Sequence, residues 1–244
     1  MVETSSKRDL LFRSEVVENF VFDDKVADVF DDMINRSVPG YQSIIKMIQT
    51  LSARYVTADS SVYDLGCSLG NATDAIIRGL KVPVCYVFAI DNSMSMIQKC
   101  KNKKFESNKN VNLKFECADM LDYPVSNASM VVLNFTLQFV APEKRDLLLK
   151  KIFDGMRSGG ILVLSEKVRF KDQRVDNLLT EIHHEFKREN GYTDLEISRK
   201  RSALEQVLIP ETIDCHIKRL LNAGFKSADV WFQCFNFTSM LAIK

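Results

Sequence analysis

Two glycines and an acid carry the most chemical information in this sequence. Gly66 and Gly70 bracket a short loop, Gly-Cys-Ser-Leu-Gly, after an apolar run that ends in Asp64. A second apolar run ends in Asp91. Glycines let a ligand approach the backbone closely, and an acid after the second strand can accept hydrogen bonds from two ribose hydroxyls. The spacing therefore predicts a site for a nucleoside-bearing cofactor at the carboxyl ends of parallel strands.

The same loop limits which cofactor it can hold. A dinucleotide fingerprint has a glycine in the middle of the loop, and this sequence has Ser68 there. NAD and FAD are therefore disfavoured, whereas S-adenosyl-L-methionine (SAM) carries no pyrophosphate. Residues 66–70 also match the nucleophile elbow of a hydrolase, with Ser68 as nucleophile. That elbow normally follows several strands, but only about sixty residues, mainly helical in pattern, precede it here; the hydrolase alternative is disfavoured.

Alternating helical and extended patterns place this loop in a mainly parallel sheet. Apolar residues at helical spacing predict helices at 25–34 and 41–55, before the first strand. Further patterns predict strands near 61–65, 84–90, 111–117, 129–135 and 161–166, and helices near 71–80, 93–103 and from Pro142 to Gly159-Gly160. This order is typical of a doubly wound α/β fold with helices on both faces of the sheet.

The last third of the chain departs from simple alternation. Helices near 174–189 and 194–208 form a predicted insertion at 169–210, which can cover the ligand cleft or meet a partner subunit. A helix near 211–222 and a hairpin of strands at 227–234 and 236–243 complete seven strands. We expect one α/β domain over residues 21–244, with a helical cap at 21–57 and a disordered or extended tail at 1–20.

Composition argues against several classes of function. Lysine plus arginine (33) nearly equals aspartate plus glutamate (32). The chain thus lacks the basic excess that is typical of proteins that bind a long nucleic acid. No apolar run approaches the ~18 residues that span a bilayer, and the polar start lacks the apolar core of a signal peptide, which predicts a cytoplasmic protein without membrane contact. The six cysteines form no Cys-x-x-Cys pair. His183 and His184 point about 100° apart on a helix, which favours surface or partner contact over a metal site.

Several segments carry a family resemblance. They are Asp32-Met-Ile-Asn-Arg-Ser-Val-Pro-Gly-Tyr41, Val62-Tyr-Asp-Leu-Gly-Cys-Ser-Leu-Gly70, Ala89-Ile-Asp-Asn-Ser93, Ala128-Ser-Met-Val-Val-Leu-Asn-Phe-Thr-Leu-Gln-Phe139, Leu164-Ser-Glu-Lys167, Asn190-Gly-Tyr192, Leu195-Glu-Ile-Ser198, Lys200-Arg-Ser202 and Trp231-Phe-Gln-Cys-Phe-Asn-Phe237. With them the chain, from about residue 20 to its end, resembles the carboxy-S-adenosyl-L-methionine synthases, a family within the SAM-dependent methyltransferase superfamily.

The resemblance implies a transferase that does not methylate. Prephenate would supply a carboxyl group to the methyl carbon of SAM, which yields carboxy-S-adenosyl-L-methionine and phenylpyruvate. The product would pass to a separate carboxymethyltransferase that modifies the wobble uridine of certain tRNAs, and the protein would be a homodimer without stable nucleic-acid binding. The residues implied to contact SAM or its carboxylated form are Tyr41, Gly66, Cys67, Ser68, Asp91, Asn92, Asp119, Met120, Asn134 and Arg201.

Arg201 and Tyr41 are the implied catalytic residues. A planar guanidinium suits the new carboxylate, and a tyrosine ring or hydroxyl can lie beside the sulfonium. On the helical pattern alone Arg201 reads as a solvated arginine. Two alternatives stay open, because fold does not fix function: a methyltransferase acting on a small molecule or RNA, and a non-enzymatic SAM-binding partner of a tRNA-modifying enzyme. The acceptor of the SAM methyl proton is also open, with the substrate's own hydroxyl or leaving carboxylate as the hypothesis.

Overall fold

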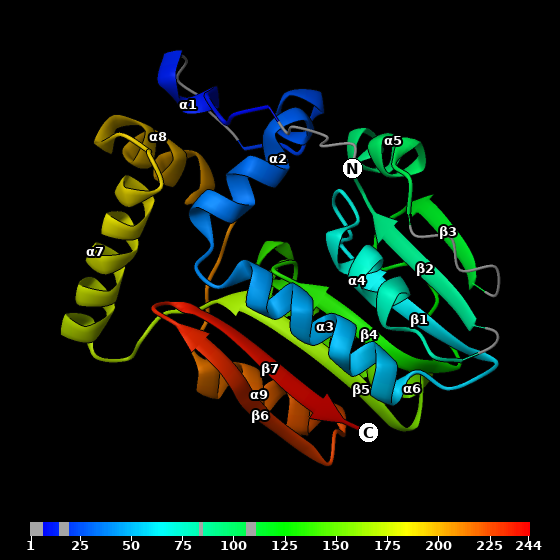
Figure 1. The fold of residues 1–244 in the computed structure, drawn as a ribbon. Helices are drawn as coiled ribbons and strands as arrows, with labels where there is room; N and C mark the ends of the chain where they lie inside the picture. Colours follow the sequence, from blue (N-terminus) through cyan, green and yellow to red (C-terminus); the bar gives the residue numbers. More distant parts are fainter. Residues whose placement is uncertain (1–6, 15–19, 83–84, 106–110) are drawn as a thin grey trace.

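The computed structural model describes residues 7–14, 20–82, 85–105 and 111–244. Its centre is one seven-stranded sheet in the order β3-β2-β1-β4-β5-β7-β6 (Figure 1). β1 to β5 are parallel, and β7 runs antiparallel between β5 and β6. The strands are β1 (Ser60–Leu65), β2 (Cys85–Asp91), β3 (Val111–Cys117), β4 (Ala128–Asn134), β5 (Met156–Lys167), β6 (Ser227–Cys234) and β7 (Phe237–Ile243). This confirms the predicted α/β fold and its terminal antiparallel hairpin.

Helices cover both faces of the sheet because successive side chains of a strand point to opposite faces, and the central strands β1 and β4 are buried on both. Val62 of β1 faces α3 (Tyr41–Tyr55) and α4 (Asn71–Gly79), where it packs in one core with Ile44 and Ile48. Leu65 of β1 faces α6 (Pro142–Gly155) and α9 (Ile213–Ala223), in a second core that includes Leu220. In Figure 1, α3 lies in front of the sheet and α6 and α9 behind it.

The remaining helices lie around the carboxyl ends of the strands. α2 (Asp24–Ser37) lies above those ends in Figure 1, beside α5 (Met94–Asn102). α7 (Gln173–Glu189) and α8 (Asp194–Leu204) form the helical insertion, and α7 projects from the body of the molecule. η1 (Leu137–Phe139) is one short turn after β4. The strand ends are thus covered by helices that are distant in sequence.

The structure corrects the predicted tail over residues 7–14. Residues 11–14 form α1 (Leu11–Ser14), which packs on α8, and Phe12 is buried there. Asp9 is also buried and accepts a hydrogen bond from the Tyr192 hydroxyl at 2.5 Å. Residues 1–6 and 15–19 of the predicted tail lie outside the described residues.

Two helix ends also differ from the prediction. α6 stops at Gly155, and the expected stop at Gly159-Gly160 lies inside β5. The reason is pairing with the chain end, since Gly159 N–H donates to the Lys244 carbonyl at 2.9 Å and Lys244 N–H donates to the Gly160 carbonyl at 3.0 Å. α8 begins at a capping box of Thr193 and ends at Leu204, four residues before the predicted boundary at 208.

Candidate functional site

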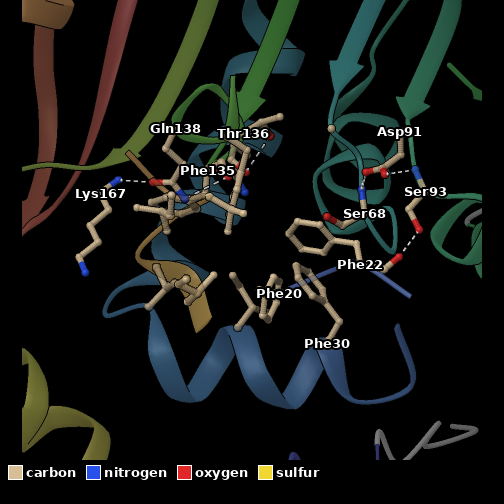
Figure 2. A pocket seen from close by; sticks show the side chains of 18 of the residues that line it. Phe20, Phe22, Phe30, Ser68, Asp91, Ser93, Phe135, Thr136, Gln138 and Lys167 are labelled. Carbon is tan, nitrogen blue, oxygen red and sulfur yellow. Dashed lines mark hydrogen bonds between the residues drawn. The ribbon is translucent and has the colours of Figure 1, made fainter. Parts of the chain in front are cut away.

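A cavity of about 720 Å³ opens at the carboxyl ends of the parallel strands, a size typical of small-molecule sites. Its floor comes from the four loops that follow β1, β2, β3 and β4. Its roof comes from α2 and the segment before it, and one end is closed by residues of α7 and α8. Figure 2 shows part of this wall, with Asp91 and Ser68 on one side and Gln138 and Lys167 on the other.

The glycine loop is held tightly against the end of β2. The N–H groups of Gly66 and Cys67 both donate to the Ile90 carbonyl, at 2.8 and 3.0 Å. Gly66 has φ +81°, and a Cβ there would lie 2.2 Å from Cγ2 of Thr136. Glycine is therefore required at this position for both its backbone angle and its lack of a side chain.

Asp91 connects the two halves of the nucleoside site. Its Oδ2 accepts from Ser68 N–H and its Oδ1 accepts from Ser93 N–H, both at 2.9 Å (Figure 2). Burial raises the pKa of the Asp91 carboxyl, and the hydrogen bonds from Ser93 and Ser68 oppose that rise. A carboxylate has about four lone-pair sites, so two remain for a ligand diol.

Two further polar atoms on the cavity wall have no partner in the described part of the chain. Asp64 is fully buried; its Oδ2 accepts from the Thr73 hydroxyl at 2.6 Å, while its Oδ1 is unpaired. Burial raises the pKa of Asp64 to about 7. Oδ1 of Asn134 is likewise buried and unpaired. An ammonium group has three donors and no acceptor, so the amino-acid end of SAM fits these two oxygens.

The structure brings nine of the ten expected site residues to this cavity. They are Tyr41, Gly66, Cys67, Ser68, Asp91, Asn92, Asp119, Met120 and Asn134. Tyr41 is buried, and its hydroxyl accepts a hydrogen bond from Nδ2 of Asn71 at 3.4 Å. Asp119 shapes its own loop, because its Oδ1 accepts from Leu121 N–H at 2.8 Å.

Arg201 is the exception. Its side chain is 60% exposed, and its Nε lies 3.6 Å from a carboxylate oxygen of Glu205, the residue that follows α8. Its charge still reaches the covered end of the cavity, where it contributes to lowering the pKa values of Lys167 and Lys187. Within a single chain, Arg201 therefore lies near the site without lining it.

Sequence reasoning missed an aromatic wall. Phe22 makes edge contacts with Phe20, Phe30 and Phe139, with ring centroids 5.1, 6.2 and 5.4 Å apart. All four rings line the cavity, and Figure 2 shows three of them below Ser68. The four residues share no periodic spacing, so no sequence pattern marks them as one surface.

Basic residues at the covered end were also missed. Lys167, Lys187, Lys200 and His183 line the cavity there. The expected surface or partner role is wrong for His183, which is buried with its Nε2 2.8 Å from the Ser37 carbonyl oxygen. α7 packs this side of the helix inward against α2 and α8, a contact that the sequence does not encode locally.

The hydrolase alternative has no support in this geometry. Across the described ranges no histidine hydrogen-bonds to the Ser68 hydroxyl, and the loop follows the first strand of the sheet. The described residues also contain no group of three or more His, Cys, Asp or Glu side chains that could hold a metal ion. No helix in the described part of the chain is long and apolar enough to cross a membrane.

Comparison with known proteins decides the family. Residues 62–160 match a methyltransferase domain model. The chain is 53% identical over 230 residues to a carboxy-S-adenosyl-L-methionine synthase of Shewanella sediminis (strain HAW-EB3), covering 94% of this chain and 95% of that protein. It is 50% identical over 246 residues to the synthase of Vibrio cholerae serotype O1 (strain ATCC 39541), covering all of both. The chain belongs to the carboxy-S-adenosyl-L-methionine synthase family. This confirms the resemblance inferred from sequence, and with it an enzyme that uses SAM.

A solved structure agrees on the fold. Human N-acetylserotonin methyltransferase, solved in complex with SAM, superposes with a TM-score of 0.61 over 91% of this chain and 55% of that chain. At 18% identity the likeness concerns the fold alone. The superposition supports the SAM-methyltransferase architecture predicted for this carboxy-S-adenosyl-L-methionine synthase family member.

Proposed function

We propose that this chain converts SAM and prephenate to carboxy-S-adenosyl-L-methionine and phenylpyruvate. The observation that carries the proposal is the match of about 50% identity along the whole chain to synthases named for that product. The product would then be used by a separate carboxymethyltransferase acting on tRNA wobble uridine. A cytoplasmic location belongs to the same proposal.

Different residues of the cavity would contact different parts of SAM. Asp91 would accept hydrogen bonds from the ribose hydroxyls, and the loop of Asp119 and Met120 would face the adenine. The unpaired oxygens of Asp64 and Asn134 would accept from the amino-acid ammonium. The buried Tyr41 ring would lie beside the sulfonium, where a π face is favourable for a cation.

The reaction balances without an external base. Loss of the ring carboxylate of prephenate as CO2 breaks one C–C bond, and its electron pair aromatises the ring as the C4 hydroxyl leaves as hydroxide. The hydroxide takes a proton from the SAM methyl group, which forms water and a sulfonium ylide. The ylide carbon then bonds to CO2. The buried walls of the cavity would keep bulk water from competing for the ylide and the CO2.

Arg201 would hold the newly formed carboxylate. A guanidinium binds such a group bidentately, and this contact would distinguish the product from SAM. In one chain Arg201 is exposed, so reaching the carboxylate requires α8 to move or a second copy to supply the residue. A homodimer is proposed through the projecting helices, because Val175, Leu178 and Leu195 are exposed apolar residues on α7 and α8.

Steady-state assays of the purified chain test the proposed function. With SAM and prephenate together we expect phenylpyruvate and carboxy-S-adenosyl-L-methionine in equal amounts, and neither product when one substrate is omitted. Methyl transfer to an added acceptor with no use of prephenate would favour the methyltransferase alternative. Turnover by the chain alone would exclude a purely non-enzymatic binding role.

A further inference from the structure

Two lysines at the covered end of the cavity form no hydrogen bond or ion pair through Nζ with the residues that the structure describes. Lys167 is the last residue of β5, and Lys187 lies in the last turn of α7. Both line the cavity, and Lys187 is only 8% exposed. Over residues 7–14, 20–82, 85–105 and 111–244, neither Nζ has a hydrogen bond or an ion pair. The Lys167 backbone N–H donates to Oε1 of Gln138 at 2.9 Å, and its side chain extends away from that bond (Figure 2).

The neighbouring Lys200 provides a contrast. Its Nζ donates to the Ser37 hydroxyl at 2.9 Å and lies 3.6 Å from Oδ2 of Asp9. The charge of Lys200 is therefore paired with a protein carboxylate, and this residue needs no ligand. Lys167 and Lys187 make no such contact with any described residue, although they line the same end of the cavity.

The electrostatic surroundings of the two lysines are unfavourable for cations. Burial, together with the charges of Lys200, Lys167 and Arg201, lowers the pKa of Lys187 to about 7. Burial also lowers the pKa of Lys167; Arg201 adds to that effect and Asp176 opposes it. Buried charges are normally paired, so this arrangement indicates that an anion completes it.

We propose that Lys167 and Lys187 together bind a carboxylate of the second substrate, namely the 2-oxo-acid arm of prephenate that is retained in phenylpyruvate. This inference rests on the proposed function and adds the residues that select the carboxyl donor. The sulfonium and ammonium of SAM are cationic and cannot pair with these lysines. Its one carboxylate lies beside the ammonium, which the pose proposed above places at Asp64 and Asn134, and a loss of SAM affinity in the lysine variants would instead assign the lysines to that carboxylate. An anionic co-substrate supplies the missing charge.

Reaction chemistry decides between the two carboxylates of prephenate. The ring carboxylate must leave as neutral CO2, so a cation pair on it would stabilise the ground state more than the transition state and slow the reaction. The oxo-acid carboxylate keeps its charge throughout. Binding it orients the ring carboxylate toward SAM without raising the barrier.

Lysine variants test the subsite. Lys167→Met and Lys187→Met should each raise the KM for prephenate about ten- to a hundredfold, the loss expected when a charge-assisted hydrogen bond is removed. Phenylpyruvate, which has only the retained carboxylate, should lose affinity by a similar factor, while SAM affinity stays unchanged. Lys171→Met is the matched control, because its side chain is 73% exposed and pairs with Asp214 at the surface.

The outcomes separate this inference from the proposed function. Unchanged prephenate KM and phenylpyruvate affinity in both variants overturn the subsite. A prephenate effect without a phenylpyruvate effect overturns the assigned orientation. Calorimetric binding of phenylpyruvate needs no turnover, so it tests the lysines even where the wild-type chain fails to consume prephenate and the proposed function falls. Thermal melting checks folding, and Lys187→Arg should recover part of the lost affinity.

Discussion

Asp91 offers the sharpest perturbation of the SAM site. Its two oxygens each accept one backbone N–H at 2.9 Å, which orients the carboxylate and leaves two lone-pair sites for the ribose. Asp91→Ala removes two charge-assisted hydrogen bonds to the ligand, each contributing about 1.5–3 kcal/mol. The sum of about 3–6 kcal/mol corresponds to SAM affinity lower by roughly two to four orders of magnitude.

Isothermal titration with two ligands isolates the ribose contribution. Wild type and Asp91→Ala are each titrated with S-adenosylhomocysteine and with its 2′,3′-dideoxy analogue. We expect the variant to weaken binding of the first ligand strongly and of the second only slightly, because the second has no diol. Asp154→Ala, at an exposed ion pair with Lys150 on α6, is the control. Equal losses for both ligands would refute the assigned contact, since Asp91 would then act only by holding the loops.

Three further predictions concern stability. Gly66→Ala should destabilise the fold by more than about 2 kcal/mol in urea unfolding and reduce SAM affinity, because the new Cβ meets Thr136 at 2.2 Å. Lys187→Met should increase the free energy of unfolding most below pH 7, by at most about 5 kcal/mol, and should raise the melting temperature accordingly. The wild-type lysine loses its proton near pH 7 in the folded state and near pH 10.5 in the unfolded state, so the stability of the wild-type chain rises between these values. The stability advantage of the variant should therefore shrink as pH rises toward 10. Arg145→Met should lower the free energy of unfolding in urea by about 3–5 kcal/mol. The fully buried guanidinium pairs with Glu211 and donates to three backbone carbonyls.

The parts of the site predicted from sequence are those encoded locally. The glycine loop and Asp91 lie at the ends of adjacent strands, and the alternation of strands and helices fixes which ends meet. The family resemblance supplied Tyr41, Asp119 and Asn134, and all three line the cavity. Asp64 lies in the segment that contains the glycine loop, but the sequence analysis gave it no role. An acid near the end of a buried strand indicates a residue that lines the cavity at the strand ends.

The parts that were missed depend on packing between distant elements. Lys187 lies on a helix that was expected to cover the cleft or meet a partner subunit, but the sequence does not show which of its polar side chains are buried. The contact of α7 with α2 and α8 buries Lys187. The segment before α2 brings Phe20 and Phe22 over the nucleoside loops. It is held there by a hydrogen bond from the Ser93 hydroxyl to the Phe22 carbonyl at 2.5 Å and by contacts between aromatic rings. No spacing rule predicts that contact. Arg201 was expected from the family resemblance, and in the described chain its side chain is exposed on α8 and does not line the cavity.

The most direct test follows one carbon atom. Prephenate labelled with carbon-13 in its ring carboxylate is incubated with SAM and the purified chain, and the nucleoside is then analysed by mass spectrometry. The account predicts a nucleoside heavier than SAM by one labelled CO2, with fragments that place the label on the former methyl carbon. Unlabelled SAM beside unconsumed prephenate, or label found only as free CO2, would contradict carboxyl transfer to SAM.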